Sequence, residues 1–166
     1  MPQTLTLDLG IKTYVIQDPD GNPAGKIRFN PSDPGLAGRW RKAMDVVERY
    51  RKQVDDETAA GKDEAELWHL LMEASDAIKN ALDYAFGARV SDVLFGGASA
   101  FAMTVNGSMV LENVLKGLSP VIEEALKSSA GNARTRMQKH TAPYQGTTRG
   151  LAPGQVLPGG PDGTPA

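Results

Sequence analysis

Cysteine is absent from all 166 residues of this chain. Its absence excludes disulfide bonds, thiolate metal sites and a cysteine nucleophile together, and it fits a reducing compartment. No apolar run approaches the roughly 20 residues that a membrane-spanning helix needs. The opening residues, MPQTLTLDLG, lack the basic and apolar regions of a secretory signal. We therefore expect a soluble, cytoplasmic protein that does not bind membranes.

Catalytic signatures are also missing. The serines do not lie in a GxSxG motif, no Walker or GxGxxG pattern occurs, and the glycine-containing stretch GGASAF has no lysine to reach a phosphate. Histidine occurs only at His69 and His140. Glu66 and Glu73 share a helical face with His69, which could form a metal site, but a second nitrogen ligand is hard to supply. We interpret this face as an exposed polar stripe, and we predict no enzyme activity and no cofactor.

Charge is unevenly distributed along the chain. Residues 128–166 carry a net charge of +3 and the rest of the chain carries −5, although the total is only −2. A mildly basic tail on an acidic body suggests that the tail binds a partner. Its cations are too widely spaced for a nucleic-acid-binding arm. We take Arg134, Arg136 and Lys139 as candidate partner-binding residues.

The first 30 residues have the pattern of strands. Leu5, Leu7 and Leu9 alternate with polar residues in TLTLDL, as they would in a half-buried strand. The segments TYVIQ and KIRF flank DPDGNPAG, a stretch dense in turn residues. We therefore predict a β-hairpin over about residues 12–30.

Apolar residues repeat every three or four positions in the next hundred residues. The pattern predicts helices over about 34–60, 63–86 and 109–127, and a short helical turn over 91–95. Asp33 or Ser32 can cap the first helix before Pro34, while Gly61 and Gly87 are suited to end the first and second. The short connection after Ala60 makes these two helices antiparallel. Pro120 lies within the last helix, where it should cause a kink or break.

The last 39 residues show no helical period, and their final 15 contain four prolines and four glycines. Such a segment cannot bury enough surface to offset the entropy of ordering it. We predict a flexible tail over 128–166 and a single folded domain over 1–127. The fold class is α+β, mainly α: an N-terminal β-hairpin followed by a bundle of three main helices with a short connecting helical turn.

Two tryptophans, Trp40 and Trp68, lie on or beside the apolar stripes of the first two helices. Both could be core residues. Tryptophan is also enriched at interaction hot spots, so either could instead anchor a partner. We keep both as candidate partner-binding residues, and we expect self-association through apolar surface that a small core leaves uncovered.

The order of these motifs resembles a known family. KIRFNPSDPGLAGRW follows the hairpin turn, a helix ending in ALDYAFG leads to SDVLFGG, and PVIEEAL lies in the last helix. This arrangement is similar to the small tail assembly chaperones of prophages and siphophages of Gram-positive bacteria. Phe29, Pro31, Ser32 and Asp33 match an element that precedes the first helix in that family, and residues 93–97 match an LFGG-like element before the last helix. The resemblance covers roughly residues 12–127 and omits the tail.

The resemblance implies a non-enzymatic chaperone that coats the tape-measure protein before tail-tube subunits polymerise around it. It also implies a product in the host cytoplasm that is not retained in the mature virion. Members are often made in two lengths by a programmed frameshift, and the extension commonly recruits other tail proteins. The alternative is a structural virion or head–tail connector subunit, and a metal-dependent enzyme using His69 is a remote alternative.

Overall fold

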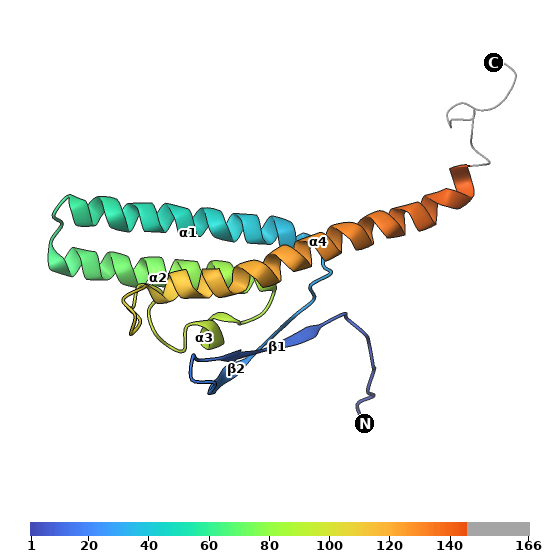
Figure 1. Cartoon of the computed structure of the whole chain (residues 1–166), viewed down its shortest axis with the longest axis horizontal. Coiled ribbons are helices and arrows are strands. Elements are labelled where there is room, and N and C mark those ends of the chain that lie inside the picture. Colours follow the sequence, from blue (N-terminus) through green and yellow to red (C-terminus); the bar gives the residue numbers. More distant parts are fainter. Residues whose placement is uncertain (146–166) are drawn as a thin grey trace, which may run out of the picture. The chain divides into compact units, whose positions relative to one another are not determined.

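The computed structural model describes the backbone of residues 1–145, with side chains for residues 1–128, 130 and 131. The chain divides into two units, residues 1–129 and 130–166. The element order is β1 (Lys12–Gln17), β2 (Pro23–Phe29), α1 (Gly35–Ala59), α2 (Glu64–Phe86), α3 (Ser91–Leu94) and α4 (Val110–Gln145) (Figure 1). The predicted α+β, mainly α class is confirmed.

The hairpin pairs β1 and β2 in antiparallel register, with Tyr14 opposite Ile27. Its turn is organised by Asp18, whose carboxylate accepts hydrogen bonds from the backbone amides of Asp20 and Asn22 at 2.9 Å each. These bonds, with one from the Asn22 side chain at 3.1 Å, hold the pKa of Asp18 below its usual value. The turn residues therefore do what their composition predicts, since Asp and Asn close turns through their own side chains.

The helices α1 and α2 form the predicted antiparallel pair and run side by side in Figure 1. Gly61 and Gly87 follow their ends with φ of 73° and 69°, a left-handed conformation that costs glycine little. Directly after the last residue of α2, the amides of Gly87 and Ala88 donate hydrogen bonds to the carbonyls of Tyr84 and Asp83, respectively. These bonds satisfy carbonyls that the helix end leaves open.

The short helix α3 begins where the sequence predicted. The carboxylate of Asp83 on α2 accepts hydrogen bonds from the amides of Val90 and Ser91 at 2.8 Å each, and from the Ser91 hydroxyl at 2.9 Å. Because an ionised acceptor strengthens each bond, Asp83 ties α3 firmly to the end of α2.

The chain then turns back toward α4. Gly96 and Gly97 have φ of 57° and 82°, so both glycines are needed for this reversal. The first amides of α4, those of Val110 and Leu111, donate to the carbonyls of Ala102 and Ala100 at 2.8 and 2.9 Å. The loop thus satisfies donors that a helix N-terminus would otherwise leave open.

The last helix is longer than predicted. We expected it to end near Lys127, yet α4 continues to Gln145, so the predicted end of this helix is corrected. Nor is the helix interrupted at Pro120. The segment ARTRMQK is rich in good helix formers although it lacks an apolar period, and periodicity alone missed it. Residues 146–166 lie outside the described part of the chain.

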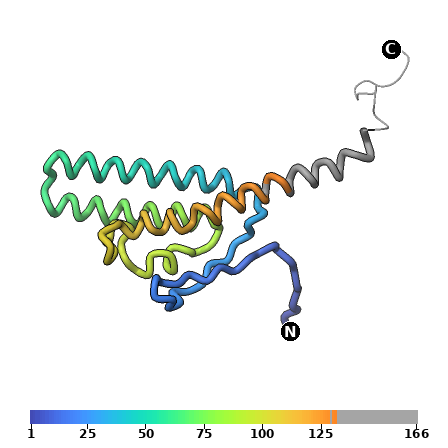
Figure 2. Tube along the Cα trace, in the orientation of Figure 1, coloured from blue at the N-terminus to red at the C-terminus, as the bar shows by residue number. Residues whose placement is uncertain are grey.

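The predicted strand over TLTLDL is wrong. Residues 1–11, which we call the arm, have no regular secondary structure, and among the described residues β1 pairs only with β2. Figure 2 shows the arm in dark blue at the start of the chain, and its Leu9 and Gly10 lie against Asn30, directly after β2. Its three leucines are nevertheless each more than 60% exposed.

The core has two clusters. One joins the inner face of the hairpin to α1, the end of α2 and α4; the other lies farther along the helices around Ile78, Leu82 and Leu111. Aromatic rings link the hairpin to both helices. The ring centroid of Phe86 of α2 lies 4.9 Å from that of Phe29 of β2 and 6.0 Å from that of Trp40 of α1. Within the described residues, no helix is long and apolar enough to cross a membrane.

Candidate functional site

The two candidate tryptophans have different surroundings. Trp40 is half-buried, packs against both core clusters and meets the ring of Phe86 edge to face. Trp68 is 66% exposed. It lies two residues before buried Leu70, which places it about 200° around the helix from the core-facing side. The structure therefore leaves Trp68, and not Trp40, accessible to a partner.

Trp68 belongs to an apolar patch near the start of α2. Met72, one turn later, is also 66% exposed. A shallow hollow of about 400 Å³ is lined by Glu64, Ala65, Trp68, His69 and Met72, and we call this surface the Trp68 patch. A flat aromatic ring beside a flexible thioether can adapt to an apolar helix, while Glu64 and His69 give the patch a polar rim.

The basic candidates Arg134, Arg136 and Lys139 fall within α4, in the second unit. The structure describes the backbone of this segment but not these side chains. Their predicted role stays a prediction.

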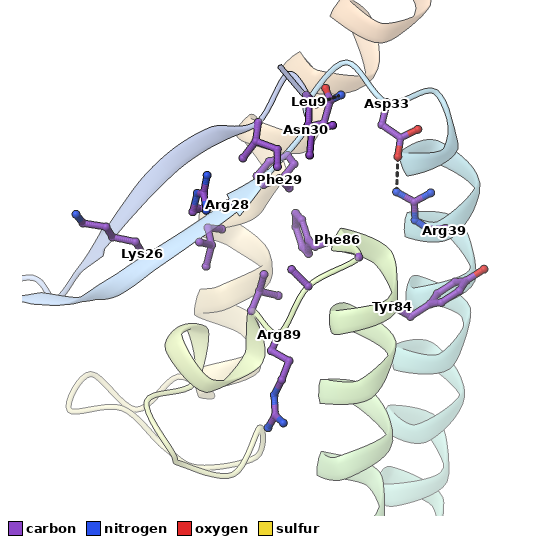
Figure 3. A pocket seen from close by; sticks show the side chains of 15 residues that line it. Leu9, Lys26, Arg28, Phe29, Asn30, Asp33, Arg39, Tyr84, Phe86 and Arg89 are labelled. Carbon is purple, nitrogen blue, oxygen red and sulfur yellow. Dashed lines mark hydrogen bonds and ion pairs between the residues drawn. The ribbon is translucent and has the colours of Figure 1, made fainter. Parts of the chain in front are cut away.

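A second hollow, which sequence reasoning missed, lies between β2 and the ends of α1 and α2 (Figure 3). It has a volume of about 860 Å³, and its lining includes Phe29 and Phe86 together with Lys26, Arg28, Arg39 and Arg89. Figure 3 shows the charged ends of Lys26 and Arg89 directed away from Phe86. The cations therefore do not converge as they would around a bound anion.

Arg39 in this hollow serves the fold. Its Nη2 donates to Asp33 Oδ2 at 2.6 Å, and its Nε donates to the carbonyl of Ala85 at 3.1 Å. The bond from Arg39, with a second from the amide of Gly35, holds the pKa of Asp33 below its usual value. Arg39 thus joins the start of α1 to the end of α2.

Metal chemistry has little support in the described part of the chain. No group of three or more His, Cys, Asp or Glu side chains gathers there as a metal would require. Glu66, one of the carboxylates near His69, lies 3.6 Å from the ammonium of Lys62 in an ion pair. The Trp68 patch can bind apolar surface.

Some of this could have been found in the sequence. The spacing of Trp68 and Met72, four residues apart and out of phase with the buried Leu70, already separates them from the core face. The role of Asp83 had no such signal, because its partners lie seven and eight residues away across a chain reversal.

Comparison of the chain with protein-family models, with curated proteins and with solved structures found no match.

Proposed function

We propose that this protein is a non-enzymatic phage tail assembly chaperone that binds the tape-measure protein and helps to recruit tail-tube subunits in the host cytoplasm. The motif order over residues 12–127 suggests the family. The observation that carries the proposal is the exposed Trp68 patch. A tape-measure protein is long and largely helical, and amphipathic helices are recognised through apolar anchors spaced one turn apart.

Three features of the patch support this role. Trp68 and Met72 lie four residues apart on one face of α2, so they can contact a partner helix together. Both are mostly exposed, so no rearrangement of the core is needed to present them. α2 is also packed against α1 along the core face, which gives the anchors a rigid support.

The test is co-expression of the full chain with the tape-measure protein from the same gene cluster, followed by size-exclusion chromatography. We expect co-elution, and we expect Trp68→Ala and Met72→Glu each to weaken binding at least about tenfold. Met103 is a matched control, because it is 63% exposed and lies outside the patch. Met103→Glu should therefore bind normally.

Failure of the wild-type chain to co-elute with the tape-measure protein would overturn the proposal. If Met72→Glu and Met103→Glu weakened tape-measure binding equally, the Trp68 patch would not be the binding surface. Mass spectrometry of purified virions separates the proposal from its alternative: a structural virion or connector subunit is retained in the particle, and a chaperone is absent from it.

A further inference from the structure

The arm has the sequence of a strand but no partner. Leu5, Leu7 and Leu9 are exposed to 80%, 70% and 61%, and they alternate with Thr4, Thr6 and Asp8. In a strand, alternation of this kind places all three leucines on one face and the polar residues on the other. Asp8 is the only charged side chain among the first eleven residues, so the leucine face could be covered without burying a charge.

A groove of matching character lies elsewhere on the same unit. It has a volume of about 440 Å³ and runs between β1 and α4. All four consecutive residues 14–17 of β1 line one side, so the backbone edge of the strand borders the groove. Opposite this edge, α4 contributes mainly small and aliphatic groups, among them Val114, Gly117 and Val121.

The edge of β1 that borders this groove can accept another strand. In the described residues β1 pairs only with β2, and in an antiparallel pair alternate peptide groups point away from the partner strand. Such an edge pairs readily with an added segment, and side-chain pockets beside it give the pairing specificity. The arm's leucines have the spacing that such an added strand would present to the groove.

The lengths also agree. β1 has 6 residues, and residues 3–9 of the arm form a segment of similar length, so each spans roughly 20 Å when extended at about 3.3 Å per residue. The arm of this chain therefore has the length and the apolar face that an occupant of the groove needs.

The arm is held away from its own groove. Asn30, directly after β2, donates from Nδ2 to the carbonyl of Leu9 at 3.0 Å. The amide of Gly10 donates to the Asp8 carboxylate at 2.9 Å, and Gly10 has a φ of 68°. These contacts fix a bend just before β1 and hold the arm outside its own groove.

We propose that residues 3–9 of one copy add as a strand to the free edge of β1 of a second copy, with Leu5 and Leu7 seated in the groove between β1 and α4. This self-association does not depend on the identity of any other partner, so it can fail or succeed independently of the proposed chaperone function.

The first test uses the absence of cysteine, which allows a single designed crosslink. Chains with Leu7→Cys and chains with Gly117→Cys are mixed and treated with a short bismaleimide. We expect a covalent product that contains one chain of each kind. With both substitutions in one chain, we expect covalent oligomers on a denaturing gel. A crosslink confined to a single chain would overturn the proposal, because it would place the arm in its own groove.

The second test fills the groove. A Cβ at Gly117 would meet nothing within 4 Å, so the side chain of Gly117→Leu would leave the helix into open space and would fill the leucine site of the groove that Gly117 lines. Gly38 is the matched control, since it lies in α1, is exposed and also has open space around its Cβ position. We expect Gly117→Leu to be monomeric by light scattering, while Gly38→Leu keeps the mass of the wild type.

A third pair of variants tests the arm without changing the groove. The double variant Leu5→Ser, Leu7→Ser should be monomeric, and Thr4→Ser, Thr6→Ser should associate as the wild type does, because only the leucine face enters the groove. A wild-type chain that is monomeric at high concentration would overturn the proposal. Self-association that survives in both Gly117→Leu and the leucine variant would also overturn it. The same holds if Gly117→Leu still self-associates and loses only tape-measure binding.

Discussion

The two halves of α2 have the same helical period and opposite surroundings. The second half, from Ser75 to Phe86, is enclosed by α1, the hairpin and α4, and buries Ile78, Leu82 and Phe86. The first half buries Leu70 but leaves Trp68 and Met72 exposed. A helix packed on one side buries a single stripe, and burying more of its circumference requires further elements. The difference shows that the hairpin and α4 cover only one end of the α1–α2 pair.

Replacing an enclosed ring should have the largest effect. Phe86→Ala removes a side chain that touches both Phe29 and Trp40, and we expect it to reduce the free energy of unfolding by about 3–5 kcal/mol. Trp68→Ala should change it by less than about 0.5 kcal/mol, because that ring is mostly in solvent. Urea denaturation followed by circular dichroism measures both. Similar losses in the two variants would break the contrast between the halves of α2.

Removing the carboxylate of Asp83 should cause the second largest loss in the free energy of unfolding. Asp83→Ala leaves the amides of Val90 and Ser91 without their acceptor, and we expect a loss of about 1.5–3 kcal/mol. Asp83→Asn keeps one oxygen acceptor and should lose less. Hydrogen exchange of the two amides gives a local measurement. Unchanged protection in Asp83→Ala would show that the carboxylate does not hold α3 to α2.

Ser75 lies where the exposed half of α2 meets the enclosed half. Its hydroxyl accepts a buried hydrogen bond from the amide of Ala100 at 3.0 Å. Ser75→Ala would leave that amide unsatisfied, so we expect a loss of roughly 1–3 kcal/mol in the free energy of unfolding. Ser99→Ala is the control, because Ser99 accepts a comparable but exposed bond from Phe101 at 3.2 Å. Equal effects would mean that the boundary at Ser75 is not buried in solution.

The smallest effect should come from Asp33, whose ion-pair partner Arg39 also bonds to the end of α2. Because folding lowers the pKa of Asp33, its stabilisation is present above the unfolded value near 3.8 and is lost as pH falls through the lower folded value. The pair is partly exposed, so its contribution should stay below about 1 kcal/mol. Wild type should exceed Asp33→Asn in stability at pH 7, and the two should converge in acid, below the unfolded pKa. A difference that persisted at low pH would exclude the carboxylate charge as its cause.

Most element boundaries in the first unit could be predicted because they depend on local chemistry. Gly61 and Gly87 follow helix ends in a left-handed backbone conformation that is unfavourable for residues with a Cβ. Asp18 closes the hairpin turn with its own side chain. These interactions involve residues close in sequence. The same holds for the exposure of Trp68, which follows from its phase relative to Leu70.

The failures have a different origin. TLTLDL has the alternation of a strand, but a strand needs a partner, and none in the described chain pairs with it. The end of α4 was missed because a helix can continue on intrinsic propensity without an apolar face. The hydrophobic periodicity of a segment predicts neither the missing strand partner of the arm nor the extension of α4.

The sequence by itself therefore determined where the hairpin and the helices α1 to α3 begin and end, and which side chains share a face. Only the tertiary structure decided which faces are covered: Trp40 packs half-buried against both core clusters, Asp83 accepts from the amides at the start of α3, and the arm stands apart from a groove that suits it. The physical reason is that periodicity and capping are local, whereas burial depends on segments that meet across long separations in the chain.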